Sequence, residues 1–349
     1  MDVEPVTDRA LLRCGVMFLL TLISVYLVYG YQWTSGDPLA DYKTATSSAI
    51  FSVSLMFILL CHELGHYIVA KRHGFSLSLP YFLPFPFAFG TLGAIIRLKS
   101  MPENRNALLE MGAAGPIAGF VAATCTAVIG MPYTENTKQI EIPGAIRTAL
   151  EEISAIEPTS IPISERSLGD MLTLPFEWLY DFMVWLGLVP QWIAGEVPIT
   201  ILADPLLLKG LGWIFLGEPL HPYATLHPAA FASWVGCLLT AINMLPVGQL
   251  DGGHICNALF PEHAKKIGRL CIFMLVFGMF FWFGWFFWAV MLYFLGATRG
   301  LLVPQSTLSM RARVVAFCAF VAFFFSFMLR PVQQVNIKLT EVRWIEETK

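Results

Sequence analysis

Long apolar stretches alternate with short polar segments along this chain of 349 residues. A helix needs about 20 predominantly apolar residues to cross the hydrocarbon core of a bilayer. The stretches that approach this length are residues 14–31, 47–70, 111–130, 225–245, 267–295 and 314–329. The pattern therefore predicts an all-α polytopic membrane protein with about six transmembrane helices, possibly seven.

The run 267–295 decides between six and seven crossings. It is too long for one ordinary span and short for two. A turn at residues 282–285 would divide it into two short helices and keep Arg299, Arg311 and Arg313 on the side of the other basic residues. Because lysine and arginine gather on the cytoplasmic side of membrane proteins, we favour two passes.

Basic residues flank the first four apolar stretches. Because successive spans cross the membrane in alternating directions, these basic residues all lie on one side of it. They are Arg9, Arg13, Lys71, Arg72, Arg97, Lys99, Arg105, Lys265, Lys266 and Arg269. This side is predicted to be cytoplasmic. Residues 131–224 then form an extracytoplasmic or interfacial insertion, with an amphipathic helix over 171–193, inside one integral-membrane domain that covers residues 1–349.

The segment 75–98 breaks the helical pattern. Pro80, Pro84 and Pro86 exclude a regular helix, and residues 94–98 are strand-forming. Gly90 and Gly93 are placed to make a bend. We expect a re-entrant, extended loop resembling a β-hairpin, which is tolerated at membrane depth only against protein or a wet cavity. An ordinary interfacial loop is the alternative.

Composition supports the membrane class. The chain is 56% hydrophobic and only 13% charged, whereas soluble domains carry about 25% charged residues. The net charge of −3 and the lack of a basic block argue against a nucleic-acid partner. The seven cysteines form no C-x-x-C pair, so we interpret them as core residues. The N-terminus resembles neither a signal nor a transit peptide, which favours a bacterial inner membrane.

The chemistry lies in His62-Glu63-Leu64-Gly65-His66, an H-E-x-x-H sequence inside the second apolar stretch. Helical spacing puts His62 and His66 on one face, where two imidazoles can bind one Zn²⁺. Glu63 lies beside them, in position to deprotonate a water held by the metal. Because ionisable groups are expensive at membrane depth, these three residues are a functional site by default.

A catalytic zinc takes three protein ligands and one open position, so another ligand must come from elsewhere. No third histidine follows at short range. Asp251 is the best candidate, since it lies at the cytoplasmic end of the stretch 225–245, at the depth of the histidines. Gly252 and Gly253 would let the backbone turn tightly beside the metal. Glu110 is the next candidate.

Several residues near these positions have an open role. Asn243 fits an interhelical hydrogen bond as well as a catalytic role. Gly115 and Gly119 have the G-x-x-x-G spacing that permits close helix packing within the chain or a dimer. His254 fits a solvated loop or a hydrogen bond to the site, and His227, before Pro228, fits a structural role at a helix start.

Two separated sequences together resemble the site-2 proteases, which are intramembrane zinc metalloproteases. One is HELGH at 62–66, and the other is N-x-x-P-x-x-x-L-D-G, realised as Asn243, Pro246, Leu250, Asp251 and Gly252. Segments 90–96 and 112–119 also look like parts of that family. The resemblance covers about 47–130 and 225–260, and residues 131–224 and 300–349 carry no family mark.

The resemblance implies that His62, His66 and Asp251 ligate zinc, that Glu63 is the general base and then acid, and that Asn243 holds substrate or stabilises the oxyanion. It also implies an endopeptidase that cuts transmembrane segments of single-span membrane proteins within the bilayer. The sequence places its active site toward the cytoplasmic side. A metal transporter and a catalytically inactive scaffold are the competing classes. Neither needs a glutamate that is not a ligand beside two ligands.

Overall fold

The computed structural model describes residues 8–34, 36–75, 77–96, 104–138, 141–143, 183–184, 196–294, 306–338 and 342–345. Three long helices are α1 (Asp8–Trp33), α2 (Tyr42–Arg72) and α3 (Arg105–Gly130), followed by the short 3₁₀ helix η1 (Met131–Tyr133). The three are long and apolar enough to cross a membrane. Asp41 and Asn104 start α2 and α3, because their carboxylate and amide oxygens accept the N–H groups of Thr44 and Ala107.

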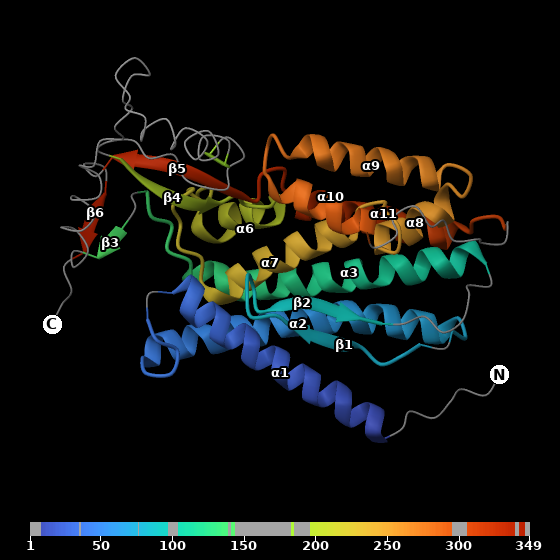
Figure 1. Cartoon of the computed structure of the whole chain (residues 1–349), viewed down its shortest axis with the longest axis horizontal. Coiled ribbons are helices and arrows are strands. Elements are labelled where there is room, and N and C mark those ends of the chain that lie inside the picture. Colours follow the sequence, from blue (N-terminus) through green and yellow to red (C-terminus); the bar gives the residue numbers. More distant parts are fainter. Residues whose placement is uncertain are drawn as a thin grey trace, which may run out of the picture.

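Six shorter helices complete the described helical part. They are α6 (Leu206–Leu216), α7 (Pro228–Asn243), α8 (Asp251–Leu259), α9 (Ala264–Gly278), α10 (Gly284–Phe294) and α11 (Met310–Ser326). The run 267–295 folds into two helices with a turn at 279–283, which begins earlier than the turn expected at 282–285, and Figure 1 shows the two helices side by side. How many helices cross the membrane stays a prediction, since none of these six exceeds 17 residues.

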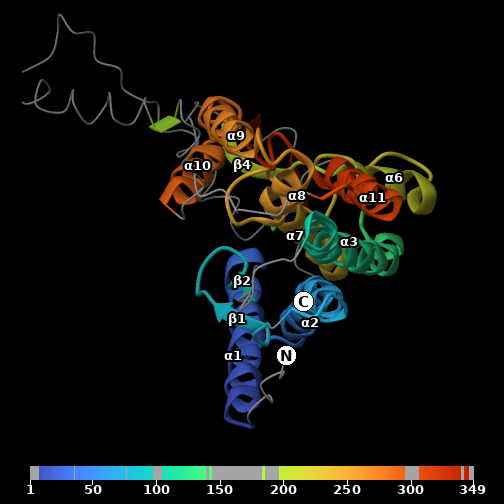
Figure 2. The same ribbon diagram turned by 90° about the vertical axis from the view of Figure 1, so that its right-hand side faces the viewer.

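Helix α7 is the centre of the fold. Most of its residues are buried, and Trp234 is fully buried while its indole N–H donates to the carbonyl of Ala203 over 2.7 Å. The helix packs against α3 and α2 and also contacts α11, and Figure 2 shows it beside α3 and above α2. The apolar helix α6, which the sequence pattern did not assign, buries Leu207, Leu208 and Leu211 in the same core.

The segment 75–98 contains the expected hairpin. Strands β1 (Tyr81–Pro84) and β2 (Thr91–Ile95) pair antiparallel, with Tyr81 opposite Ile95. Gly90 has a positive φ of 83°, and a Cβ there would collide with the backbone of Val25 on α1. Glycine therefore permits both the turn and the close contact with α1. The re-entrant position of this hairpin in a membrane stays a prediction.

Two further strand pairs lie at the opposite end of the molecule from α8 (Figure 1). Strand β3 (Glu141–Pro143) pairs parallel with β6 (Arg343–Ile345). Strand β4 (Glu196–Leu202) pairs antiparallel with β5 (Val332–Lys338). The C-terminal strands are thus joined to the segment 131–224. The amphipathic helix expected over 171–193 lies outside the described residues, apart from 183–184.

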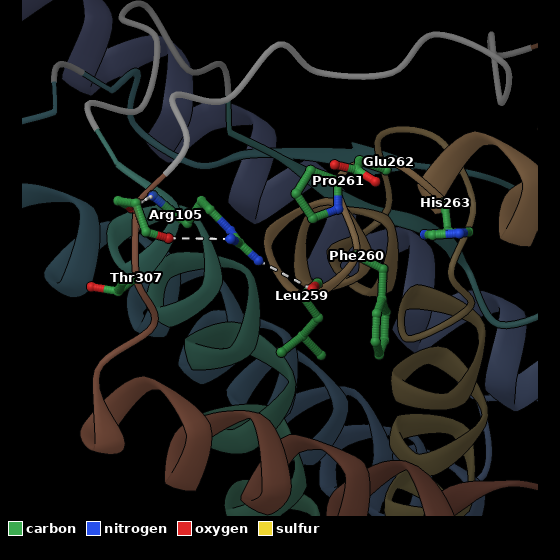
Figure 3. Close-up of a pocket in the computed structure, with 8 residues that line it drawn as sticks. Arg105, Leu259, Phe260, Pro261, Glu262, His263 and Thr307 are labelled. Atoms are coloured by element: carbon green, nitrogen blue, oxygen red, sulfur yellow. Dashed lines mark hydrogen bonds between the residues drawn. The ribbon is translucent and has the colours of Figure 1, made fainter.

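Arg105 connects three segments at the α8 end (Figure 3). Its guanidinium donates to the carbonyls of Ala258 and Leu259 over 2.8 and 3.1 Å, and to the carbonyl of Ser306 over 3.1 Å. The last carbonyls of a helix have no partner within the helix, so a cation there satisfies and stabilises them. Arg105 therefore fixes the C-terminal end of α8 to the start of α3, beside a cavity of about 480 Å³.

Candidate metal centre

His62 and His66 lie one turn apart on α2, as their spacing predicts. About 15 Å of helix separate His62 from the end of α2 at Arg72. His62 is 6% exposed. The imidazoles therefore lie well inside the helical bundle rather than at its surface.

The structure brings Asp251 to these histidines from 189 residues further along the chain. The Nε2 atom of His62 lies 3.2 Å from Oδ2 of Asp251, and Nε2 of His66 lies 3.2 Å from Oδ1. The two Nε2 atoms are also 3.2 Å apart. Of the described histidines, cysteines and acids, these three make the group that could hold a metal ion.

This donor set fits zinc. Zinc binds imidazole nitrogen and carboxylate oxygen at about 2.0–2.2 Å in tetrahedral geometry, which puts two donors about 3.3 Å apart. The two Nε2 atoms are 3.2 Å apart, and each lies 3.2 Å from one of the two carboxylate oxygens of Asp251, which is close to that edge. Three protein ligands leave one tetrahedral position free, as in catalytic rather than structural zinc sites.

A carbonyl of α3 sets the tautomer of His66. The Nδ1–H of His66 donates to the carbonyl of Met111 over 2.8 Å, which leaves the lone pair of Nε2 pointing toward Asp251 and His62. Such hydrogen bonds fix the orientation of a ligating histidine and raise its basicity. The sequence carried no signal for this contact, because the partner is a main-chain atom.

Glu63 is 7% exposed and follows His62 directly on α2. Within the described part of the chain, no group donates a hydrogen bond to its carboxylate. A carboxylate in such surroundings is costly without a partner. Water at the open metal position would supply that partner.

Small residues of α3 make room for the two imidazoles. A Cβ at Gly115 would collide with the ring of His66, and a Cβ at Gly119 would lie 3.0 Å from Nδ1 of His62. On α2, a Cβ at Gly65 would press on the carbonyl of Ala114. Of the two interpretations of the G-x-x-x-G spacing, packing within the chain or in a dimer, the structure shows packing within the chain. The two glycines lie against the imidazoles of the candidate metal centre.

The turn between α7 and α8 positions Asp251. Helix α7 ends at Asn243, and Asp251 is the first residue of α8. A Cβ at Gly252 would collide with the carbonyl of Met244, and one at Gly253 with that of Gly248. The two glycines therefore let the start of α8 press against the turn, as predicted from their place after Asp251.

The other candidate residues lie as follows. Asn243 is partly buried at the end of α7, and its side chain makes no hydrogen bond to the described residues, so its role stays a prediction. Glu110 is not part of the histidine cluster: its Oε2 lies 3.1 Å from Nε2 of His73 and 3.4 Å from the guanidinium of Arg311. It joins α2, α3 and α11 as an ion-pair centre.

Two histidines of open role now have a place. His227 caps α7, where its Nδ1 accepts the N–H of Ala229 over 3.3 Å, which is the structural role expected of it. The interpretation of His254 as a solvated loop residue is wrong. It lies within α8 against Gly112, and its Nδ1 is buried without a partner among the described residues. One turn of helix separates it from Asp251, so the apparent loop is a helix.

The model of peptidase family M50 matches residues 50–287, which include the histidine pair, Asp251 and the helices between them. The chain belongs to peptidase family M50. This membership confirms the resemblance to the site-2 proteases, and with it the class of membrane metalloproteases.

Three relatives are similar over much of the chain. The probable zinc metalloprotease EGY2 of rice, described as chloroplastic, is 27% identical over 297 residues, 84% of this chain and 44% of its own. EGY2 of Arabidopsis thaliana is 27% identical over 292 residues, which are 82% of this chain and 42% of the relative. EGY1 of the same plant is 26% identical over 223 residues, which are 64% of this chain and 32% of the relative. The chain spans less than half the length of these relatives. No solved structure matches.

We expect Gly115→Ala to abolish zinc retention and activity, because the added methyl group takes the space of the His66 ring. Metal content after purification, measured by atomic emission, checks this. The control is Gly15→Ala on α1, where a Cβ meets nothing within 4 Å. It should keep full metal and gain stability of up to about 1 kcal/mol from helix propensity. Full zinc in Gly115→Ala would contradict the packing argument.

Proposed function

We propose that this protein is a zinc-dependent intramembrane endopeptidase that hydrolyses peptide bonds in the transmembrane segments of single-span membrane proteins. The observation that carries the proposal is the cluster of His62, His66 and Asp251 at 3.2 Å separations, with Glu63 beside it, inside apolar helices. Membership of peptidase family M50 and relatives named zinc metalloproteases support the same chemistry.

The residues divide the work of hydrolysis. His62, His66 and Asp251 would hold the metal. When bound, zinc polarises the scissile carbonyl and makes water a nucleophile at neutral pH. Glu63 takes the proton of the attacking water and passes it to the leaving amine. Asn243, at the end of α7, would serve as an amide donor that holds the substrate or stabilises the developing oxyanion.

The hairpin supports capture of an unwound substrate. Strand β1 packs on α1, where Phe18 and Phe82 lie edge to face with ring centroids 5.2 Å apart. On β2, Leu92 and Ile95 are exposed, and among the described residues β2 pairs only with β1. A strand edge of this kind can bind an extended peptide through main-chain hydrogen bonds. We propose that the outer edge of β2 holds the substrate beside the metal centre.

The charge distribution supports a cytoplasmic position of the site. The last turn of α2, with Lys71, and the first turns of α9 and α11, with Lys265 and Arg311, lie at the end of the molecule that contains α8 (Figure 1). Glu135 follows η1, which continues α3 at the other end. We propose that the α8 end faces the cytoplasm. The chain is an integral membrane protein. A bacterial inner membrane stays a prediction, and the chloroplast location belongs to the relatives' names.

Glu63→Gln tests the base. We expect it to retain zinc while cleavage of a single-span substrate falls by at least about 100-fold, because the amide cannot accept the proton. Metal analysis and initial rates in proteoliposomes measure the two effects. The counterpart is Asp251→Ala, which should lose both metal and activity. Substantial turnover by Glu63→Gln would refute its role, and full zinc in Asp251→Ala would refute the ligand assignment.

Cysteine labelling tests the orientation. In a variant without native cysteines, a cysteine at position 71 and another at position 135 should react with an impermeant maleimide from opposite sides of sealed vesicles. The positive-inside preference puts position 71 on the cytoplasmic side. If both react from one side, the orientation is wrong, and so is the depth assigned to the metal centre.

A substrate series tests local unwinding. Each backbone group of a lipid-embedded helix is bonded internally, so opening one in hydrocarbon costs several kcal/mol. We expect Asn, Gly or Pro in the cytoplasmic third of the target span to raise the initial rate, and Leu to lower it. Rates are compared at equal membrane expression. Equal rates for all-Leu and Asn- or Pro-containing spans would show that unwinding does not limit cleavage, and would contradict the proposed capture of an unwound strand.

A further inference from the structure

A second cavity, of about 790 Å³, lies at the end of the molecule opposite the metal centre. Its walls come from the last turns of α1, from β4, from the segment 221–226 and from the first turn of α7. The proposed hydrolysis uses none of these segments. The cavity is therefore separate from the catalytic site in both position and composition.

Strand β4 lines one part of this cavity. Four consecutive residues of the strand, 199–202, line the cavity. Because successive side chains of a strand point to opposite faces, four consecutive lining residues indicate that the cavity runs along the edge of the strand. In the described part of the chain, β4 pairs only with β5. Its other edge thus offers N–H and C=O groups to an added strand.

The remaining lining of the cavity combines aromatic rings with one carboxylate. Tyr29, Trp33, Tyr223 and Phe231 line the cavity together with Asp204. No described residue forms a hydrogen bond or ion pair with the Asp204 carboxylate, and burial raises its pKa to about 6 against the opposing effect of Lys209. A poorly solvated carboxylate among aromatic rings is suited to a cation, which gains both a charge-assisted hydrogen bond and contact with the ring faces.

Trp33 connects the cavity with the hairpin. Trp33 lines the cavity, and its indole N–H donates to the carbonyl of Ala88 over 2.9 Å. The same ring stacks on Phe89, with centroids 5.5 Å apart. Ala88 and Phe89 belong to the turn between β1 and β2. An extended peptide that leaves the cavity past Trp33 therefore reaches the strand edge proposed to present the substrate to the metal centre.

We propose that this cavity is a second substrate-binding site, which takes the extended segment next to the substrate's transmembrane span on the non-cytoplasmic side. The peptide adds to the edge of β4, and a lysine or arginine of that segment binds Asp204. This inference rests on the proposed function, since it assigns a specificity determinant to the same protease. It makes binding depend on residues outside the span that is cut.

Three single-span substrates test the proposal. The first carries a short non-cytoplasmic stub with one lysine, the second has glutamine in place of that lysine, and the third ends at the span. We expect Asp204→Asn to raise KM for the first substrate by about tenfold at unchanged kcat, which is the size of one charge-assisted hydrogen bond. KM for the other two substrates should not change.

The matched control is Glu135→Gln, which converts an exposed carboxylate at the same end of the molecule but outside the cavity. It should leave KM unchanged for all three substrates. Normal cleavage of the stubless substrate by Asp204→Asn shows that this variant is folded. Equal KM values of wild type and Asp204→Asn for the lysine stub would overturn the proposal.

A binding measurement separates this inference from the proposed function. A photoreactive residue at Thr200, in the Glu63→Gln background, should cross-link the lysine stub and lose the cross-link when Asp204→Asn is added. Because this readout needs no hydrolysis, it stays positive even if the protein cleaves nothing. If the cross-link is absent while the wild-type protein cleaves the lysine stub normally, the second site is refuted and the protease assignment stays intact.

Discussion

The close contact between α2 and α3 is the constraint on which the rest of the structure depends. Two imidazoles and a carboxylate project from an apolar helix, and an apolar environment supplies no partners for them. The imidazoles are accommodated because α3 presents Gly115 and Gly119 where side chains would otherwise stand, and Gly65 lets the helices approach. The same approach brings the carbonyl of Met111 to His66.

The third candidate ligand makes the candidate metal centre depend on the whole bundle. Two candidate ligands come from one turn of α2, but Asp251 must be brought to them by the turn after α7. Central α7 is held by its buried surface, and α8 is held at its far end by Arg105 on α3. Helix α3 thus contacts the ligands on α2 and anchors the helix of the third ligand. Small shifts of α3 would therefore change the positions of all three donor atoms.

The two sites that we propose lie at different ends of the molecule, and the hairpin runs between them. The metal centre lies toward the end with the basic residues, and the cavity along β4 lies at the other. The turn of the hairpin touches Trp33 at the cavity, while its strands run back along α1 and α2. A substrate bound in extended form along this hairpin would run from the edge of β4 to the edge of β2.

Local patterns were enough to predict the long helices, the hairpin at 75–98 and the three residues that the structure brings together as a group able to hold a metal ion, but not helices α6 and α8. Helical spacing puts His62 and His66 on one face of the helix, and prolines and glycines indicate breaks and turns. Asp251 could be chosen because a lone carboxylate beside an apolar stretch demands a partner. The glycines at 112–119 were read as a packing motif without knowing what they pack against.

Tertiary structure decided everything that depends on contacts between distant segments. That Gly115 faces His66, that Met111 fixes its tautomer and that Glu110 pairs with His73 and Arg311 follow from how α3 is rotated against α2. The pairing of β4 with β5, and the cavity beside it, join residues more than a hundred positions apart. A one-dimensional pattern records which face of an element is apolar, but not which face of another element meets it, because that choice is made by the packing of the whole bundle.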